Sequence, residues 1–362
     1  MDGAELKVKD GIREKHLDGI RGLAALAVAI FHFFRCFNNE AISYSKQING
    51  FFISAFWNGH FAVSVFFVLS GYLFFGKFYC RSLKYGLYSI VKRYLRLSIP
   101  ILFVCLFAYL IHKAGLFFNI ESSTISNSDW AKKWYFFDPN IMLAIKESLW
   151  SDFFFFDPNR TYNSNLWTIS YELIAVAIII LIAVSGRTIR KAGSYLVLVT
   201  SLMLTYGTHY FEFMLGALLS MLLMERIILS GRLITIVIIV TSLSMAALNL
   251  PSSIAPLASN LLYPIAAVII IAASTMSAYL TRILSSRFLL KLGDNSFGLY
   301  LMHFITVNSV ASWVYVNTNS LTATLISYIL STSVMTLFFT HCIEIPWVKF
   351  LNRAFGKQPN QP

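Results

Sequence analysis

Charged side chains are scarce in this sequence. Only 13 % of its 362 residues are charged, whereas 57 % are hydrophobic and the mean hydropathy is +0.66. A soluble globular domain carries nearer to a quarter charged residues. The composition therefore excludes an ordinary soluble domain and predicts an all-α polytopic membrane protein.

Cysteine is scarce as well, and several signatures of catalysis are missing. The four cysteines stand far apart, without paired or metal-ligand spacing, at Cys36, Cys80, Cys105 and Cys342. The sequence has no Gly-x-Ser-x-Gly elbow, no P-loop and no zinc signature. These absences count against a hydrolase, an ATPase or a metalloenzyme, and we expect neither a bound metal nor a disulfide framework.

Long hydrophobic runs, by contrast, are abundant. A helix needs about 20 apolar residues to cross a bilayer. Ten such spans are predicted, the fifth of them short, at residues 19–37, 58–78, 95–114, 166–185, 194–207, 209–229, 232–249, 257–279, 297–316 and 321–345. The start of the chain is polar and basic, and no small-residue cleavage site follows the first run, which predicts an uncleaved first span rather than a signal peptide.

The basic residues fall in alternate connections between these spans. A net charge of +12 would fit a nucleic-acid partner, but this alternation follows the positive-inside rule of membrane proteins instead, and we expect no nucleic acid. With ten spans, every strongly basic connection lies on one side, so both termini are predicted to be cytoplasmic. The residues on that side are Lys7, Lys9, Arg13, Lys15, Lys77, Arg81, Lys84, Lys92, Arg93, Arg96, Arg187, Arg190, Lys191, Arg226, Arg232, Arg282, Arg287, Lys291, Lys349, Arg353 and Lys357.

The long connection 115–165 is predicted to lie outside. It mixes basic and acidic residues and is rich in aromatic ones, among them Trp130, Trp134 and Phe153 to Phe156. Such rings can stack on sugars, but an aromatic belt at the membrane interface is the favoured interpretation.

The stretch that opens the first span, residues 16–34, carries an arginine and a histidine that lipid should exclude. Eleven residues separate Arg21 from His32, which is about three helical turns and 16 Å of rise, so both side chains point the same way. Ionisable residues inside a membrane are functional candidates, and Asp18 is close enough to pair with Arg21. His32 can serve near pH 7 as a general base or an acyl-accepting nucleophile. The alternative is a buried His–Arg pair that only ties helices together.

The segment Leu-Asp-Gly-Ile-Arg-Gly-Leu-Ala at 17–24, with His32 beyond it, resembles the first helix of the acyltransferase-3 family. These are integral membrane enzymes that O-acylate, mostly O-acetylate, cell-envelope glycans. Segments similar to further family motifs follow in family order at 66–71, 93–96, 165–172, 211–216, 292–303 and 344–346. The resemblance is to the stand-alone membrane form, with the family domain expected at 18–348, a cytoplasmic segment at 1–17 and a cytoplasmic tail at 349–362.

The resemblance also implies roles for individual residues. The arginine and histidine of the family's first helix map onto Arg21 and His32. The family's Arg-x-x-Arg motif, thought to meet the acyl-CoA donor, maps onto Arg93 and Arg96 at the cytoplasmic start of the third span. Their spacing places both on one helical face, where they can hold phosphates or act as positive-inside anchors.

Two further candidates lie in later motifs. Glu172 is expected a few residues below the outer surface, where it can orient an acceptor hydroxyl, pair with His32, or only extend to water. His303 shares a helical face with Ser296 and is either a second site residue or a hydrogen-bonded structural histidine. The Ser-Gly pair at 70–71 and the segment 211–216 are assigned mainly to packing.

Together these features predict an O-acyltransferase of the bacterial cytoplasmic membrane. Acetyl-CoA, or another acyl-CoA, is the expected donor, and a lipid-linked or growing envelope glycan is the expected acceptor. The donor thioester is expected to enter toward Arg21 and His32, and His32 to deprotonate the hydroxyl or relay the acyl group.

A rival interpretation is a transporter or exporter, because intramembrane charges also mark transport paths. The hydropathy repeats typical of transporters are not visible in the sequence. A third interpretation is a catalytically silent scaffold. It is disfavoured because the candidate site residues of the family motifs are all present, namely Arg21, His32, Arg93, Arg96, Glu172 and His303.

Overall fold

A computed structural model describes residues 14–37, 52–224, 231–248 and 254–355. The described residues form helices joined by short connections, and they contain no β-strand. This confirms the predicted all-α class. Predictions that fall on 1–13, 38–51, 225–230, 249–253 and 356–362 lie outside the described residues.

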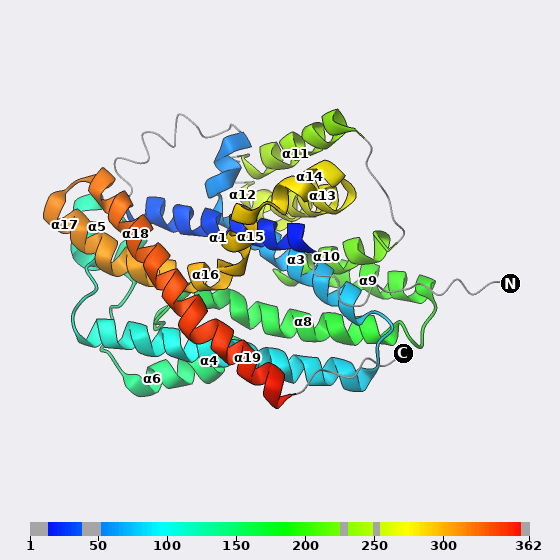
Figure 1. Ribbon diagram of the computed structural model, residues 1–362, viewed down its shortest axis with the longest axis horizontal. Helices are drawn as coiled ribbons and strands as arrows, with labels where there is room; N and C mark the ends of the chain where they lie inside the picture. The colour runs from blue at the N-terminus through cyan, green and yellow to red at the C-terminus, as the bar shows by residue number, and fades with distance from the viewer. Residues whose placement is uncertain (1–13, 38–51, 225–230, 249–253, 356–362) are drawn as a thin grey trace.

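In Figure 1, α1, α4 and α8 run roughly horizontally, α18 and α19 cross them obliquely, and α11, α13 and α14 lie together at the top. In chain order the helices of eight or more residues are α1 (Lys15–Cys36), α3 (Gly59–Phe78), α4 (Leu83–Lys113), α5 (Asn119–Ser126), α8 (Trp167–Ser185), α9 (Lys191–Thr205), α10 (Tyr210–Leu222), α11 (Arg232–Ala246), α13 (Tyr263–Met276), α15 (Arg287–Asp294), α16 (Ser296–Thr306), α18 (Leu321–Phe339) and α19 (Ile345–Ala354). Shorter pieces are η1 (Phe52–Trp57), η2 (Ala131–Lys133), α6 (Ile141–Lys146), η3 (Glu147–Ser151), α7 (Asp152–Phe154), η4 (Ser164–Leu166), α12 (Ala255–Leu257), η5 (Ala258–Leu262), α14 (Ala278–Leu284), η6 (Val307–Ala311), α17 (Ser312–Thr318) and η7 (Thr340–Glu344).

Each of the ten predicted spans coincides with a helical segment. Seven of these segments are long and apolar enough to cross a membrane, so the chain is a multi-pass membrane protein. The other three, α9, α10 and α11, have 15, 13 and 15 residues. They are shorter than the usual spanning length, so the count of ten, and the sidedness derived from it, stays a prediction.

Glycines in the motif segments allow helices to approach closely. A Cβ atom on Gly71 of α3 would lie 2.0 Å from the carbonyl oxygen of Phe213 in α10, and one on Gly216 of α10 would lie 1.9 Å from that of Val68 in α3. Only glycine fits at such distances, as is typical of small-residue contacts between membrane helices. The packing role predicted for these two motif segments is therefore confirmed at their glycines.

The helix that carries the Arg-x-x-Arg motif begins earlier than the predicted span. The span was predicted to begin near residue 95, but α4 begins at Leu83, with the side chain of Ser82 capping its first turn. Arg93 therefore lies about 15 Å along the helix rather than at its start. The first twelve residues of α4 were not predicted as part of the span, because their basic and other polar side chains lower the hydropathy. Lysine and arginine nevertheless favour a helix.

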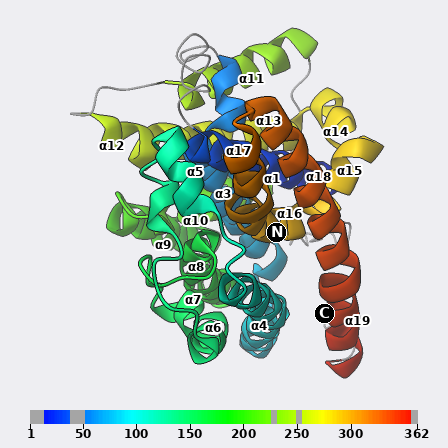
Figure 2. The same ribbon diagram turned by 90° about the vertical axis from the view of Figure 1, so that its left-hand side faces the viewer.

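The connection 115–165 does not simply project from the outer end of α4. Its segment α6–η3–α7 runs back beside α4 and contacts α8, as Figures 1 and 2 show. The hydroxyl of Tyr94 donates to the carbonyl of Leu149 at 2.6 Å, and the ring of Tyr94 packs on that of Phe153 at 4.8 Å. Tyr94 lies about 28 Å along α4 from its last residue, Lys113, so this segment reaches the level of the arginine motif.

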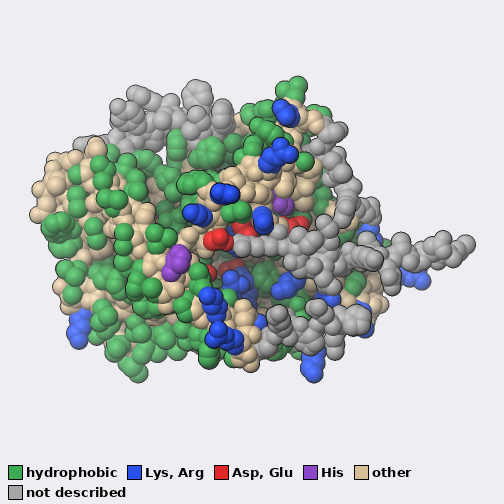
Figure 3. All heavy atoms as spheres, viewed as in Figure 1, with side chains coloured by type: hydrophobic (Ala, Val, Ile, Leu, Met, Phe, Trp, Pro, Cys, Tyr) green, Lys and Arg blue, Asp and Glu red, His purple; other side chains and the backbone are tan. Residues whose placement is uncertain are grey.

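The described charges are distributed unevenly over the surface. On the face in Figure 3, Lys and Arg side chains gather in the centre and at the right, whereas the left is largely hydrophobic. This asymmetry agrees in kind with the basic connections predicted to share one membrane side. The four cysteines are free, two buried and two exposed, so the described chain contains no disulfide.

Candidate functional site

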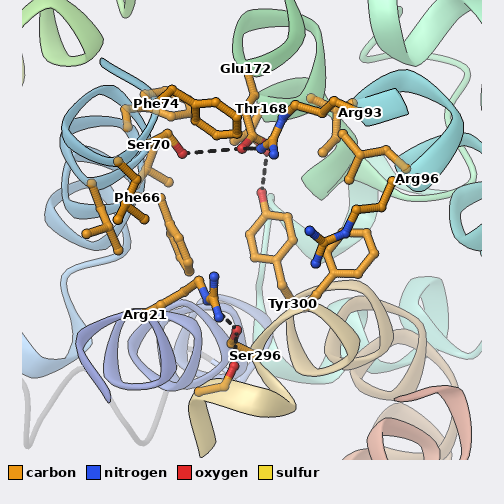
Figure 4. A pocket seen from close by; sticks show the side chains of 18 of the residues that line it. Arg21, Phe66, Ser70, Phe74, Arg93, Arg96, Thr168, Glu172, Ser296 and Tyr300 are labelled. Carbon is orange, nitrogen blue, oxygen red and sulfur yellow. Dashed lines mark hydrogen bonds and ion pairs between the residues drawn. The ribbon is translucent and has the colours of Figure 1, made fainter. Parts of the chain in front are cut away.

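A cavity of about 320 Å³ lies among α1, α3, α4, α8 and α16, and three arginines face it from two sides (Figure 4). We call it the arginine cavity. Its wall includes four cationic and three carboxylate side chains and several hydroxyls, namely Arg21, Lys77, Arg93, Arg96, Glu172, Asp294, Glu344, Ser70, Thr168, Ser296 and Tyr300.

Arg21 is fixed on one side of this cavity. Its guanidinium is 2.6 Å from the carboxylate of Asp18, as the spacing in the sequence predicts, and its Nε donates to the hydroxyl of Ser296 at 3.2 Å. Helices α1 and α15 lie very close here because Gly293 has no side chain: a Cβ at this position would stand 2.2 Å from the carbonyl oxygen of Asp18. This close approach brings Ser296, at the start of α16, within hydrogen-bonding distance of Arg21.

Arg93 lies on the opposite side of the cavity, ion-paired with Glu172 of α8. The same carboxylate oxygen accepts from the hydroxyl of Ser70 at 3.3 Å, and the guanidinium lies over the ring of Phe74 at 4.4 Å. Of the roles considered for Glu172, pairing with His32 is therefore not what this structure shows. The partner that the structure gives Glu172 is Arg93, 79 residues away on another helix.

Two cations of the arginine cavity remain without a partner among the described residues. Neither Arg96 nor Lys77 makes a hydrogen bond or ion pair there. Arg93 also keeps one buried donor, Nε, unsatisfied. Unpaired cationic groups and a spare donor facing one cavity are suited to an anionic ligand, because charge-assisted contacts are the stronger hydrogen bonds.

A second cavity, of about 580 Å³, opens beside the later half of α1. We call it the histidine cavity because His32 lines it. Arg35, also on α1, lines it as well. The rest of its wall is mainly aromatic and comes from the connection 115–165 and the start of α8, namely Trp130, Trp134, Phe154, Phe155, Phe156, Pro158, Ser164, Asn165, Trp167, Ser170 and Tyr171. Trp130 stacks on the ring of His32, with centroids 4.8 Å apart.

His32 is held by His303 through a hydrogen bond whose direction can be worked out. Nδ1 of His303 is 2.8 Å from the carbonyl oxygen of Leu299, which only accepts, so this nitrogen carries the proton. Nε2 of neutral His303 is then an acceptor, and it lies 2.9 Å from Nδ1 of His32. His32 must therefore donate from Nδ1, which leaves the lone pair on its Nε2 free to accept a proton.

The walls of the two cavities are joined by hydrogen-bonded side chains. The hydroxyl of Tyr300 lies 2.8 Å from that of Thr168 and donates to the carbonyl of Asn165 at 2.7 Å. The side-chain amide of Asn165 in turn lies 3.3 Å from Nε2 of His303. Thr168 therefore supplies a hydroxyl that links the two walls. A continuous chain of polar contacts runs from the arginine cavity to His32.

The structure groups the predicted site residues differently from the sequence. Arg21, Arg93, Arg96 and Glu172 share one cavity, whereas His32 lines the other and His303 lies behind it. Arg21 does not contact His32, because the rise along α1 separates them. This corrects the idea of one Arg–His pair at the thioester.

Four contributors to the cavities were not named as site residues from the sequence. Asn165 and Tyr300 stood inside recognised motifs, so their polar groups were visible but not their contacts. Lys77 stood in a basic connection and was indistinguishable from a topological anchor, whereas Arg35 stood near the outer end of the first span, outside the recognised motif. Only the folded arrangement identifies them.

A cluster of metal-ligand types lies outside both cavities. Cys105, Glu147 and Asp152 are buried, with their ligating atoms within 4.8 Å of one another. Glu147 is already hydrogen-bonded by Thr161 and by the backbone of Tyr162, and a structural zinc site usually has four ligands. Burial, and then the nearby Glu147 carboxylate, raise the pKa of Asp152 well above its ordinary value. These facts describe a carboxyl pair that holds a proton, and the expectation of no metal stays a prediction.

Comparison with protein families decides the assignment. The family model of the acyltransferase-3 group, described as an acyltransferase domain, matches residues 14–340. The chain belongs to the acyltransferase-3 family. No curated protein and no solved structure matches it. The acyltransferase-3 domain and the apolar helices together make the protein a membrane acyltransferase, and both cavities lie within the matched region apart from Glu344.

Proposed function

We propose that the protein transfers an acetyl group from acetyl-CoA to a hydroxyl of a cell-envelope glycan in the bacterial cytoplasmic membrane. The observation that carries this proposal is the division of the site. Arginines from α1 and α4 face one cavity, a histidine with a free Nε2 faces another, and hydrogen-bonded side chains join the two.

The arginine cavity supports binding of the donor. Arg93 and Arg96 come from one face of α4, and Arg21 enters from α1 opposite them. The phosphates of coenzyme A need several convergent cationic donors, and arginine presents a planar fork that matches phosphate oxygens. In this proposal Glu172 orients Arg93, and the thioester points toward Tyr300 and Thr168.

The histidine cavity supports binding and activation of the acceptor. Its aromatic walls suit the faces of sugar rings, and its volume lies in the range of small-ligand sites. Nε2 of His32 takes the proton of the hydroxyl while its oxygen attacks the thioester carbonyl, or Nε2 attacks that carbonyl itself and then passes the acyl group to the hydroxyl. In either route the C–S bond breaks and the thiolate of coenzyme A leaves. The cationic ring that forms is stabilised by its hydrogen bond to His303.

The test uses purified protein with acetyl-CoA labelled in the acetyl group. The acceptor is the envelope glycan isolated from a strain that lacks the gene. Label should appear in the glycan as an ester that mild alkali releases, and NMR of glycan from the parent strain should show O-acetyl signals that the deletion strain lacks. Folded protein that binds no acetyl-CoA and labels no glycan would contradict the proposal.

A further inference from the structure

Arg35 differs from the two ion-paired arginines of the site. It lies one helical turn after His32 on α1 and lines the same cavity. Arg21 and Arg93 each pair with a carboxylate, whereas Arg35 takes part in none of the ion pairs among the described residues. Its guanidinium lies instead between two rings, 5.2 Å from the centroid of Phe31 and 5.3 Å from that of Trp130.

The described wall of the cavity that Arg35 lines carries no opposing charge. No aspartate or glutamate is among the residues that line the histidine cavity. The cavity therefore presents one permanent cation, together with His32, inside a wall of rings. Aromatic faces support a guanidinium through cation–π contact without neutralising it, so its charge and its planar fork of donors stay available to a ligand.

We infer that Arg35 binds an anionic group of the acceptor, a carboxylate or a phosphate, next to the hydroxyl that is acylated. This rests on the proposed function, because it takes the histidine cavity as the acceptor site. Residues three apart on a helix are neighbours, about 5–6 Å between Cβ atoms. The anionic group must therefore lie within about one sugar ring of the hydroxyl that meets Nε2 of His32.

Two kinds of acceptor supply this chemistry, an acidic sugar and a sugar joined to a lipid carrier through phosphate. Binding to the purified full-length protein distinguishes them. The first probe pair is methyl glucuronide and methyl glucoside, which differ by a carboxylate. The second pair is farnesyl phosphate and farnesol, which differ by a phosphate. Quenching of tryptophan fluorescence reports occupancy, because Trp130, Trp134 and Trp167 line the cavity.

At least one anionic probe should bind roughly tenfold or more tightly than its neutral counterpart, as expected for a charge-assisted contact. Arg35→Gln should remove that preference and leave the affinity for the neutral probe unchanged, while Arg35→Lys should keep part of it. Lys133→Gln is the matched control, because Lys133 is an exposed cation beside Trp134 that does not line the cavity.

Equal affinities within both pairs overturn the inference, and so does the absence of binding by all four probes. A preference that survives in Arg35→Gln overturns it as well. Binding of labelled acetyl-CoA is measured in the same preparations. Protein that binds acetyl-CoA but shows no anionic preference refutes the role of Arg35 alone, whereas protein that binds no acetyl-CoA refutes the proposed function.

Discussion

The two cavities meet at Tyr300 and Asn165, yet they are built from different chemistry. The arginine cavity has cations and carboxylates from several helices, and ion pairs fix two of its arginines. The histidine cavity has aromatic walls, no carboxylate, and one histidine whose tautomer is set by a neighbour. Charge convergence suits a polyanionic donor, whereas rings and a free base suit a neutral hydroxyl. The contrast teaches that substrate binding and proton transfer can be disabled separately.

The largest effect is expected at the base. His32→Gln keeps hydrogen-bonding capacity and approximate volume but cannot accept the proton. Transfer should fall by about 10²–10⁴-fold, while insertion, the thermal unfolding midpoint and the affinity for acetyl-CoA stay unchanged. Label transfer and acetyl-CoA binding are measured on the same purified variant. Normally acylated glycan from a His32→Gln strain would make the histidine structural and revive the transporter or scaffold interpretation.

In the arginine cavity, we expect a substitution to weaken binding of acetyl-CoA. Arg96→Gln removes a cation that makes no hydrogen bond or ion pair among the described residues. Glu344, in the same cavity wall, interacts with Arg96 electrostatically, so the unfolding midpoint of the variant is measured beside its donor affinity. Affinity for acetyl-CoA should fall roughly ten- to a hundredfold, as for one lost charge-assisted contact. Lys84→Gln is the matched control, because this exposed lysine lies in the same basic stretch but not in the cavity. Equal donor affinity in both variants would return Arg96 to a topological anchor.

A smaller effect on the rate of transfer is expected at His303, which accepts the hydrogen bond from His32. His303→Leu removes the acceptor that holds Nδ1–H of His32, so kcat should fall about tenfold with an unchanged KM for acetyl-CoA. His303→Gln, whose amide oxygen still accepts, should retain more activity than His303→Leu. Steady-state kinetics at saturating acceptor separate the two constants. Equal kcat in the two variants, or a loss that follows the folded fraction, would mark His303 as structural.

The smallest effect is expected on the pH dependence of unfolding, at Asp152 outside both cavities. Because the pKa of Asp152 is raised in the folded protein, its contribution to stability is fully present below its ordinary carboxyl range and is lost as pH rises. The unfolding midpoint of the wild type should therefore fall more between pH 5 and 9 than that of Asp152→Asn. Asp129→Asn, an exposed control in the same connection, should behave like the wild type. Identical pH profiles for all three proteins would contradict the raised pKa.

What the sequence predicted follows from local periodicity. Helix positions and the Asp18–Arg21 pair depend on spacing within one segment, and both are observed. The pairing of Arg93 with Glu172 and of His32 with His303 joins residues 79 and 271 positions apart. No spacing rule reaches across such separations, so the sequence identified the residues but not their partners.

Two further features of the fold were hidden for physical reasons. Hydropathy indicates where a helix can enter lipid, not where the helix begins. The polar first turns of α4, before Arg93, were therefore not predicted. The aromatic residues of the connection 115–165 gave no periodic signal for a segment that packs back along α4. The interfacial-belt interpretation therefore overlooked the rings that form the wall of the histidine cavity.

The division between donor and acceptor cavities is tested most directly by a structure of the protein with bound acetyl-CoA. The account predicts the diphosphate in the arginine cavity, within hydrogen-bonding distance of Arg93, Arg96 or Arg21, with the thioester directed toward Tyr300. His32 should remain bonded to His303 and make no contact with the phosphates. Phosphates bound instead beside Arg35 and Trp130 in the histidine cavity would contradict the account.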